Sequence, residues 1–243
     1  MEIKDSVILI TGAATRVGRE VALCFAEKGA NISFSYYLED EPWQETLQAI
    51  EAYGVKCLAT QVEIRQKSQI ENLVTATVQK FGKIDVLLNN ASVWLKTSFL
   101  NISEAEWDLS LDVNLKGPFL CSQAVAPVML AQGGGVIINI TDLSAFQVWP
   151  GYTHHAASKA GLVALTKSLA YELAPTIRVN AIAPGTVLLP PNPSPEKVQW
   201  AIDKSVLKKV GSPKNVAQVA QLFIENDFIT GAVYHVDGGR SLV

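Results

Sequence analysis

Cysteine is scarce in this chain of 243 residues, and the three that it has are Cys24, Cys57 and Cys121. An odd number of widely spaced cysteines in apolar surroundings predicts free, buried thiols in a reducing cytoplasmic compartment, with no metal site among them. Positive charge is not in surplus either, because 20 Lys and Arg stand against 23 Asp and Glu, for a net charge of -3. Since nucleic-acid binding needs a basic face, we expect no nucleic-acid partner.

Long hydrophobic runs are also missing. The first apolar stretch, Val7–Ile10, follows the acids Glu2 and Asp5 and is too short for a signal sequence or a membrane span. Hydrophobic residues nevertheless make up 49% of the chain, which is enough for a large core. No internal repeat or linker interrupts the sequence, so we predict one domain over residues 1–243.

Short β-branched runs alternate with amphipathic runs of helical length along the chain. Strands that are apolar throughout are typical of a parallel sheet covered on both faces. With right-handed crossovers, the pattern predicts an α/β fold, a doubly wound (Rossmann) parallel sheet with helices on both faces. The predicted strands cover residues 7–10, 32–36, 55–60, 84–88, 136–140, 179–182 and 232–236, and the predicted helices begin near residues 17, 42, 67, 104, 154 and 213.

One segment holds too much proline for regular structure. Pro190, Pro191, Pro193 and Pro195 fall within residues 188–197, a density that excludes a regular helix or a central strand. The segment follows the carboxyl end of a predicted strand, where doubly wound folds bind ligands. We expect a loop over about residues 186–210 that covers a substrate, with a plain surface connector as the alternative.

The turn after the first strand carries glycine where a nucleotide-binding unit needs it. Gly12 stands at the tight turn, and Gly18 stands where the next helix must approach the sheet. Such a unit points backbone N–H groups and a helix N-terminus at a pyrophosphate. The spacing therefore predicts a dinucleotide site.

A basic residue within this turn bears on which dinucleotide is bound. Arg16 occupies a position where glycine is commoner, and its guanidinium could pair with a ribose 2′-phosphate. The second strand ends at Tyr36 without a carboxylate to hold a free 2′-hydroxyl, although Glu39 and Asp40 follow closely. These residues favour NADP(H) over NAD(H).

Seven motifs, in order along the chain, resemble those of the short-chain dehydrogenase/reductase family. They are Thr11-Gly12 with Gly18, Asn89-Asn90-Ala91, Asn114, Lys159 within Ala157–Gly161, Arg178-Val179-Asn180, Pro184-Gly185, and Ile229-Thr230-Gly231 with Val236–Gly239. The resemblance implies an NADP-dependent oxidoreductase in which Lys159 binds the nicotinamide ribose and Asn114 positions a water of the proton relay. It implies cofactor contacts at Gly12, Thr15, Arg16, Val17, Gly18, Tyr36, Val62, Asn90, Ala91, Ser92, Lys159, Pro184, Gly185 and Val187.

Within that family the residues look similar to those of pteridine reductases. These enzymes also carry an arginine in the glycine turn, and Asp142 stands where most relatives have serine. The resemblance implies substrate contacts at Ser92, Trp94, Asp142 and Tyr152, with Trp94 stacking on a flat ring such as a pterin. An ordinary core aromatic is the alternative for Trp94.

Position 155 departs from the family, because His155 stands where the catalytic tyrosine is expected, four residues before Lys159. Reduction of a C=O or C=N bond needs a proton for the heteroatom. Three hypotheses are open for the proton donor. In the first, His155 is the acid and Asp142 is its partner. In the second, the proton comes from Asp142 or from Tyr152, which lies on the same helical face as His155. In the third, the chain binds NADP but has little catalytic activity.

These observations lead to one functional prediction. We expect an NADPH-dependent reductase of a small molecule, with a pterin-like substrate as first choice and no metal. The alternatives are a carbonyl reductase or alcohol dehydrogenase acting on other substrates, and a catalytically weak NADP-binding protein. The family resemblance also implies a homo-oligomer, either a dimer or a tetramer.

Overall fold

A computed structural model describes all residues from Met1 to Val243. Its centre is a sheet of seven strands, all parallel, in the order β3-β2-β1-β4-β5-β6-β7. The strands are β1 (Val7–Ile10), β2 (Asn31–Tyr36), β3 (Cys57–Gln61), β4 (Val86–Asn89), β5 (Gly135–Ile140), β6 (Ile177–Pro184) and β7 (Val233–Val236). The order reverses between β1 and β4, which is where folds of this kind bind ligands.

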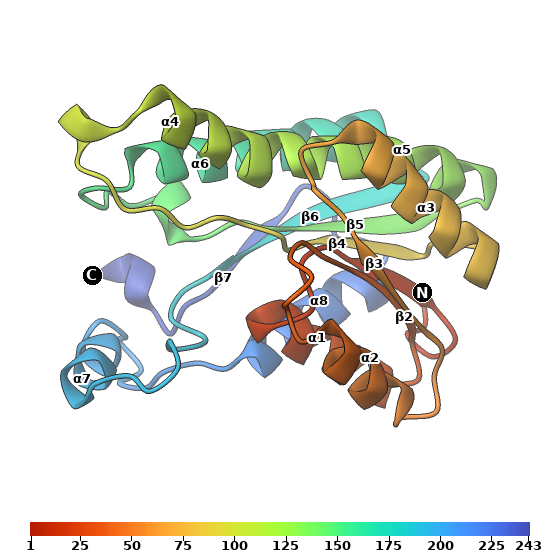
Figure 1. Cartoon of the computed structure of the whole chain (residues 1–243), viewed down its shortest axis with the longest axis horizontal. Helices are drawn as coiled ribbons and strands as arrows, with labels where there is room; N and C mark the ends of the chain where they lie inside the picture. The colour runs from red at the N-terminus through yellow and green to blue at the C-terminus, as the bar shows by residue number, and fades with distance from the viewer.

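Helices cover both faces of the sheet, as Figure 1 shows. One layer holds α1 (Arg16–Glu27), α2 (Trp43–Glu51) and α8 (Pro213–Glu225), and the other holds α3 (Lys67–Phe81), α4 (Glu104–Leu111), α5 (Gly117–Ala131) and α6 (Thr153–Glu172). A separate cluster of buried apolar side chains fills the space under each layer. The predicted doubly wound α/β fold is therefore confirmed. No helix combines the length and the apolar character that a membrane crossing requires.

Local sequence signals account for several helix boundaries. The Ser103 side chain accepts a hydrogen bond from the Glu106 backbone, and the Glu106 side chain accepts one from the Ser103 backbone, so a capping box starts α4 as predicted. Helix α3 begins at Lys67 as predicted and is followed by Gly82, whose φ of 81° is a left-handed conformation that glycine adopts without strain.

Two segments differ from the prediction. The expected loop over residues 186–210 contains helix α7 (Pro195–Asp203), because proline at the first helical position loses no hydrogen bond. Between α4 and α5 the chain forms a π-helical turn, Asp112–Lys116, where a helix was expected to run on from near residue 104. Such turns occur often at functional sites, and this one contains Asn114.

Candidate active site

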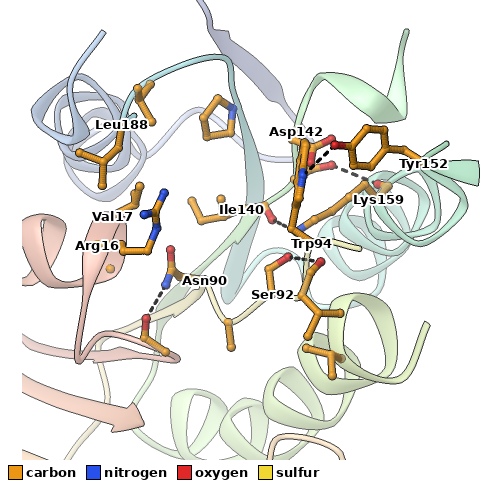
Figure 2. Close-up of a pocket in the computed structure, with 18 of the residues that line it drawn as sticks. Arg16, Val17, Asn90, Ser92, Trp94, Ile140, Asp142, Tyr152, Lys159 and Leu188 are labelled. Atoms are coloured by element: carbon orange, nitrogen blue, oxygen red, sulfur yellow. Dashed lines mark hydrogen bonds between the residues drawn. The ribbon is translucent and has the colours of Figure 1, made fainter. Parts of the chain in front are cut away.

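A cavity of about 1750 Å³ opens at the carboxyl ends of the strands. It is larger than the roughly 300–1000 Å³ of an ordinary small-molecule site, so a dinucleotide and a substrate can share it. Every residue predicted to contact the cofactor lines its wall: Gly12, Thr15, Arg16, Val17, Gly18, Tyr36, Val62, Asn90, Ala91, Ser92, Lys159, Pro184, Gly185 and Val187. Figure 2 shows Arg16 and Val17 on one side of the cavity, with Trp94, Asp142, Tyr152 and Lys159 on the other.

The glycine turn forms a cradle that fits a pyrophosphate. A Cβ atom on Gly18 would lie 2.5 Å from the Gly12 carbonyl oxygen, so only glycine lets α1 approach the turn this closely. No side chain caps the N-terminus of α1, because the hydroxyl of Thr15, at the N-cap position, accepts no hydrogen bond from the helix backbone. The first N–H groups of the helix are therefore free for an anion in the cavity.

Side chains directly after β1 and β4 fix the shape of this cradle. The Asn90 amide donates to the carbonyl oxygens of Thr11, at 3.0 Å, and Gly12, at 2.8 Å. In return, the Thr11 hydroxyl oxygen accepts from the backbone N–H groups of Asn90 and Ala91. The motif after the fourth strand thus joins the two strands on either side of the point where the strand order reverses.

Arg16 holds a conformation that is unusual for its residue type. Its φ of 53° lies in the left-handed region, which costs a non-glycine residue about 1–3 kcal/mol and occurs often at functional sites. The side chain is exposed and lines the cavity. The predicted contact of Arg16 with a 2′-phosphate stays a prediction.

A carboxylate does lie beyond the end of β2, although not one that the sequence singled out. Glu41 lines the cavity, and its Oε1 accepts from the backbone N–H groups of Tyr37, at 2.9 Å, and Leu38, at 2.8 Å. Glu39 and Asp40, the acids noted in the sequence, do not line the cavity. Two adjacent N–H groups can hold a carboxylate or a phosphate, so Glu41 occupies a site for anionic oxygen.

Asp142 and His155 form a buried pair. His155 Nε2 lies 2.5 Å from Asp142 Oδ2, and His155 Nδ1 lies 3.2 Å from the Val93 carbonyl oxygen. The His155 side chain is completely buried and does not line the cavity, whereas Asp142 does. Burial raises the pKa of Asp142, but the hydrogen bond from His155 and the charge of Lys159 outweigh it, so the pKa lies below its ordinary value.

Tyr152 lies at the N-cap position of α6, immediately before the helix. Its hydroxyl oxygen accepts from Trp94 Nε1 at 3.2 Å, which leaves the hydroxyl proton free, and both side chains line the cavity. Trp94 is 54% exposed and its ring also lies 4.5 Å from that of His155. Trp94 is therefore a wall of the cavity and not a core aromatic.

Lys159 reaches the cavity from inside the protein. Its ammonium donates to the Ile140 carbonyl oxygen at 2.9 Å, and the side chain is almost wholly buried. Burial lowers the pKa of Lys159 to about 8, although the nearby Asp142 carboxylate opposes the shift. A cation thus lies beside the wall formed by Asp142.

Asn114 ties the substrate side of the cavity together without lining it. Its Oδ1 accepts from the Ser92 hydroxyl, at 2.9 Å, and the Val93 N–H, at 2.8 Å. Its Nδ2 donates to Ser158 Oγ at 3.1 Å and lies 3.3 Å from His155 Nδ1. These contacts hold Ser92 in the cavity wall, and the predicted part of Asn114 in a proton relay stays a prediction.

The sequence did not single out several residues of the cavity wall, and three of them have large side chains that lie together. They are Trp149 in the loop after β5, Trp200 on α7, and Arg240 in a short 3-10 turn, Arg240–Leu242, after β7. They stand at no recognisable spacing and meet only through the tertiary fold. The adjacent Val236–Gly239 motif was the nearest available signal for Arg240.

Comparison with known proteins shows the family to which this chain is similar. Residues 12–241 match the family model described as enoyl-(acyl carrier protein) reductase. The chain is 38% identical to 3-oxoacyl-(acyl-carrier-protein) reductase FabG of Thermotoga maritima, over 98% of this chain and 99% of that protein. It is 37% identical to the (2S)-((R)-hydroxy(phenyl)methyl)succinyl-CoA dehydrogenase subunit BbsD of Thauera aromatica, over 100% and 99% of the two chains.

A solved structure agrees with these relatives. A 7α-hydroxysteroid dehydrogenase complexed with NADH and 7-oxo glycochenodeoxycholic acid superposes with a TM-score of 0.92 at 30% identity, over 98% of this chain and 95% of that one. None of these three names is that of a pteridine reductase, so the predicted likeness to that branch is not supported by them. The protein is an oxidoreductase with a site for a nicotinamide cofactor, and it belongs to the short-chain dehydrogenase/reductase family.

Proposed function

We propose that this protein uses NADPH to reduce the ketone group of an acyl thioester. The names of two relatives support a thioester, because one acts on a 3-oxoacyl group carried by a protein and the other on a coenzyme A derivative. Carbonyl reduction of a substrate other than a pterin is also an alternative that the sequence predicts. The large cavity, with room beside the cofactor wall, is compatible with such a substrate.

When bound, the reduced nicotinamide supplies a hydride, which adds to the ketone carbon. The residues of the chain must then give a proton to the ketone oxygen, so that the products are an alcohol and the oxidised cofactor. The donor must face the cavity and hold a proton that no protein acceptor takes.

Tyr152 meets this requirement, and this observation carries the mechanism. Its hydroxyl accepts from Trp94 Nε1 and keeps its own proton free in the cavity. His155 is excluded as a direct donor by its position, because the ring is completely buried and both nitrogens are engaged by protein atoms. Figure 2 shows the Tyr152 hydroxyl pointing toward Asp142, at the end of the cavity opposite Arg16.

Asp142 and Lys159 set the charge around that proton. The Asp142 carboxylate holds His155 on Oδ2 and Ser144 on Oδ1, so it ties the loop after β5 to helix α6. The Lys159 ammonium stabilises negative charge that develops on the ketone oxygen. His155 acts through Asp142 and is a positioning residue.

Cofactor preference follows from Arg16 and Glu41. Arg16 provides a guanidinium for the 2′-phosphate, whereas the Glu41 carboxylate, bound to the backbone of Tyr37 and Leu38, would repel that phosphate.

The variant Arg16→Gly removes the charge at a φ that suits glycine. We expect it to weaken NADPH binding about 10- to 100-fold with little effect on NADH binding. Glu41→Gln should strengthen NADPH binding. Equal affinity of the wild-type protein for NADPH and NADH would remove the 2′-phosphate argument.

A pterin is the second candidate substrate, because the half-exposed Trp94 ring could stack on a flat heterocycle. NADPH oxidation measured with acetoacetyl-CoA, dihydrobiopterin, dihydrofolate and simple ketones decides between the two. We expect the thioester to give the highest kcat/KM. A higher value for a pterin would replace the proposed substrate class, and tight NADPH binding without turnover of any of them would favour a catalytically silent protein.

A further inference from the structure

Arg240 is held between two tryptophan rings at the wall of the cavity. The guanidinium carbon lies 5.0 Å from the centre of the Trp149 ring and 4.9 Å from that of Trp200. Stacking on indole suits a flat, weakly hydrated cation and leaves its edges uncovered. Trp149 comes from the loop after β5 and Trp200 from α7, so three separate segments fix the position of this one charge.

The edge of this guanidinium is largely unused by the protein. Its only hydrogen bond is from Nη1 to the Thr186 hydroxyl at 3.0 Å, and it forms no salt bridge. The neighbouring carboxylate of Asp237 is occupied, because it accepts from the backbone N–H groups of Gly239, at 2.9 Å, and Ser241, at 2.7 Å. An arginine has five N–H donors, so most of those of Arg240 are available to a ligand. Burial lowers the pKa of Arg240, although the Asp237 and Asp142 carboxylates oppose the shift, so the charge of Arg240 is partly removed from water.

The charges around Arg240 also favour an anion. Besides Arg16, Arg65 and Lys159, three cations line the cavity, one in the loop after β4 and two on or beside α7: Lys96, Lys197 and Lys204. The other cavity acids lie beyond β2 and β3, where Glu41 is bound to backbone N–H groups and Glu63 is paired with Arg65. Asp142, on the substrate side, already holds His155 and Ser144. A substrate that carries negative charge would therefore be attracted to this end of the cavity.

We propose that Arg240 binds an anionic oxygen group of the substrate, either a carboxylate or a phosphate, through the free edge of its guanidinium. This inference deepens the ketone reduction proposed above. A chain of rings runs from the reacting site to Arg240, because Trp94 lies beside Tyr152, with ring centres 4.9 Å apart, and beside Trp149, at 5.6 Å. The anionic group is thus held away from the ketone, with an aromatic wall between them.

Arg240 could instead serve only to hold α7 in place through Trp200. The two roles predict different results, because a purely structural arginine would affect charged and neutral ligands equally. A bound anion would make only the charged ligand depend on Arg240.

The test compares matched ligands in the presence of NADP⁺, with which no ketone can be reduced. The first pair is 4-oxopentanoate and its methyl ester, and the second is 4′-phosphopantetheine and pantetheine. Binding is followed by intrinsic fluorescence, to which Trp149 and Trp200 should contribute, and is checked by calorimetry. We expect the charged member of one pair to bind at least about 10-fold more tightly than its neutral match, as a charge-assisted contact of about 1.5–3 kcal/mol implies. The pair that shows this preference identifies carboxylate or phosphate as the source.

In Arg240→Gln the preference should fall below about threefold, while the affinity for the neutral ligand stays the same. Lys209→Gln, which removes an exposed charge outside the cavity, should keep the preference and is the matched control. If Arg240→Gln does not fold, the same ligand pairs are compared with Arg240→Lys. They are also compared with the wild-type protein in high salt, where the preference for the charged ligand should be lost. A preference absent from the wild-type protein, retained in Arg240→Gln, or lost together with neutral binding would overturn the proposal. Failure to reduce any ketone would reject the proposed function and leave this binding result standing.

Discussion

At the scale of single residues, position 155 determines how the active site differs from the pattern expected for the family. A histidine is shorter than the expected tyrosine, and its ring lies behind the cavity wall with Nε2 against Asp142. The proton-donating position in the cavity is then left to Tyr152, three residues earlier and at the start of the same helix. Sequence alone kept both residues as candidates, because their helical spacing placed them on one face.

Restoring tyrosine at position 155 should not by itself restore the family's arrangement. A phenol reaches further than an imidazole, and Asp142 Oδ2 already lies 2.5 Å from the histidine ring. We expect His155→Tyr to reduce the free energy of unfolding by about 1–3 kcal/mol through overpacking, as measured by urea denaturation. The double variant His155→Tyr/Asp142→Ser should recover that stability, because serine leaves room for the hydroxyl. A single variant as stable as the wild type would show that the Asp142 side chain does not block this space.

Lys159 should make cofactor binding depend on pH. Because its pKa in the folded protein is lowered to about 8, the residue loses its charge above that pH. We expect NADPH affinity, measured by fluorescence titration, to fall about 3- to 10-fold between pH 7 and pH 9.5 as the ammonium is lost. Lys159→Met should bind more weakly and show no such dependence; an unchanged dependence in this variant would assign it to another group.

The lowered pKa of Lys159 also affects the stability of the fold, which should rise with pH while NADPH affinity falls. The unfolded chain keeps this proton until its ordinary pKa of 10.5, whereas the folded protein releases it near pH 8. The unfolded state therefore binds more protons between these values, and the contribution of Lys159 to the free energy of unfolding rises with pH across that window.

Residues that carry a pattern could be found from the sequence, and residues that depend on tertiary contact could not. Gly12, Gly18 and Lys159 stand in motifs of fixed spacing, and all three line the cavity as expected. Arg240 directly follows the Val236–Gly239 motif but is not part of it, and Trp200 lies near no motif. The two meet only because α7 and the chain after β7 lie against the same cavity. No single-residue pattern could have joined them.

At the scale of elements, the packing of α1 against the glycine turn controls the cofactor site. A Cβ on Gly18 would meet the Gly12 carbonyl oxygen at 2.5 Å and the Asn90 amide at 2.6 Å. Both are parts of the cradle, so the helix would have to move away from the turn.

We expect Gly18→Ala to lower the free energy of unfolding by about 1–3 kcal/mol and to weaken NADPH binding at least about 10-fold. Gly134→Ala is the matched control, because its new Cβ would come no closer than 3.7 Å to a neighbouring atom. Thermal unfolding and cofactor titration of both variants measure the effect. Equal behaviour of the two would contradict close packing of α1 as the reason for glycine at position 18.

Element boundaries were predictable where a local signal exists. The capping box of α4 and the left-handed Gly82 after α3 are such signals, and both elements end or begin where the sequence indicates. Proline density was misleading in residues 188–197, because Pro195 starts α7 and does not exclude it. The π-helical turn at Asp112–Lys116 leaves no periodicity that a short segment could display.

At the scale of the whole molecule, the alternation of apolar strands and amphipathic helices was sufficient to predict the parallel sheet and its two helical layers. Buried parallel strands must be apolar on both faces, which makes this class easy to recognise. The expected dimer or tetramer stays a prediction. Analytical ultracentrifugation at micromolar concentration should give two or four times the 26.3 kDa chain mass, and a monomer would contradict it.

The central claim is that Tyr152, and not His155 or Asp142, gives the proton to the substrate. The most direct measurement compares kcat for reduction of acetoacetyl-CoA by the wild-type protein, Tyr152→Phe and Asp142→Asn at equal saturation with NADPH. Tyr152→Phe removes only the hydroxyl, so we predict a loss of about 10²–10⁴-fold in kcat with NADPH binding unchanged. Asp142→Asn should lose less, because it disturbs positioning. Wild-type kcat in Tyr152→Phe together with an inactive Asp142→Asn would contradict the claim and assign the proton to the Asp142–His155 pair.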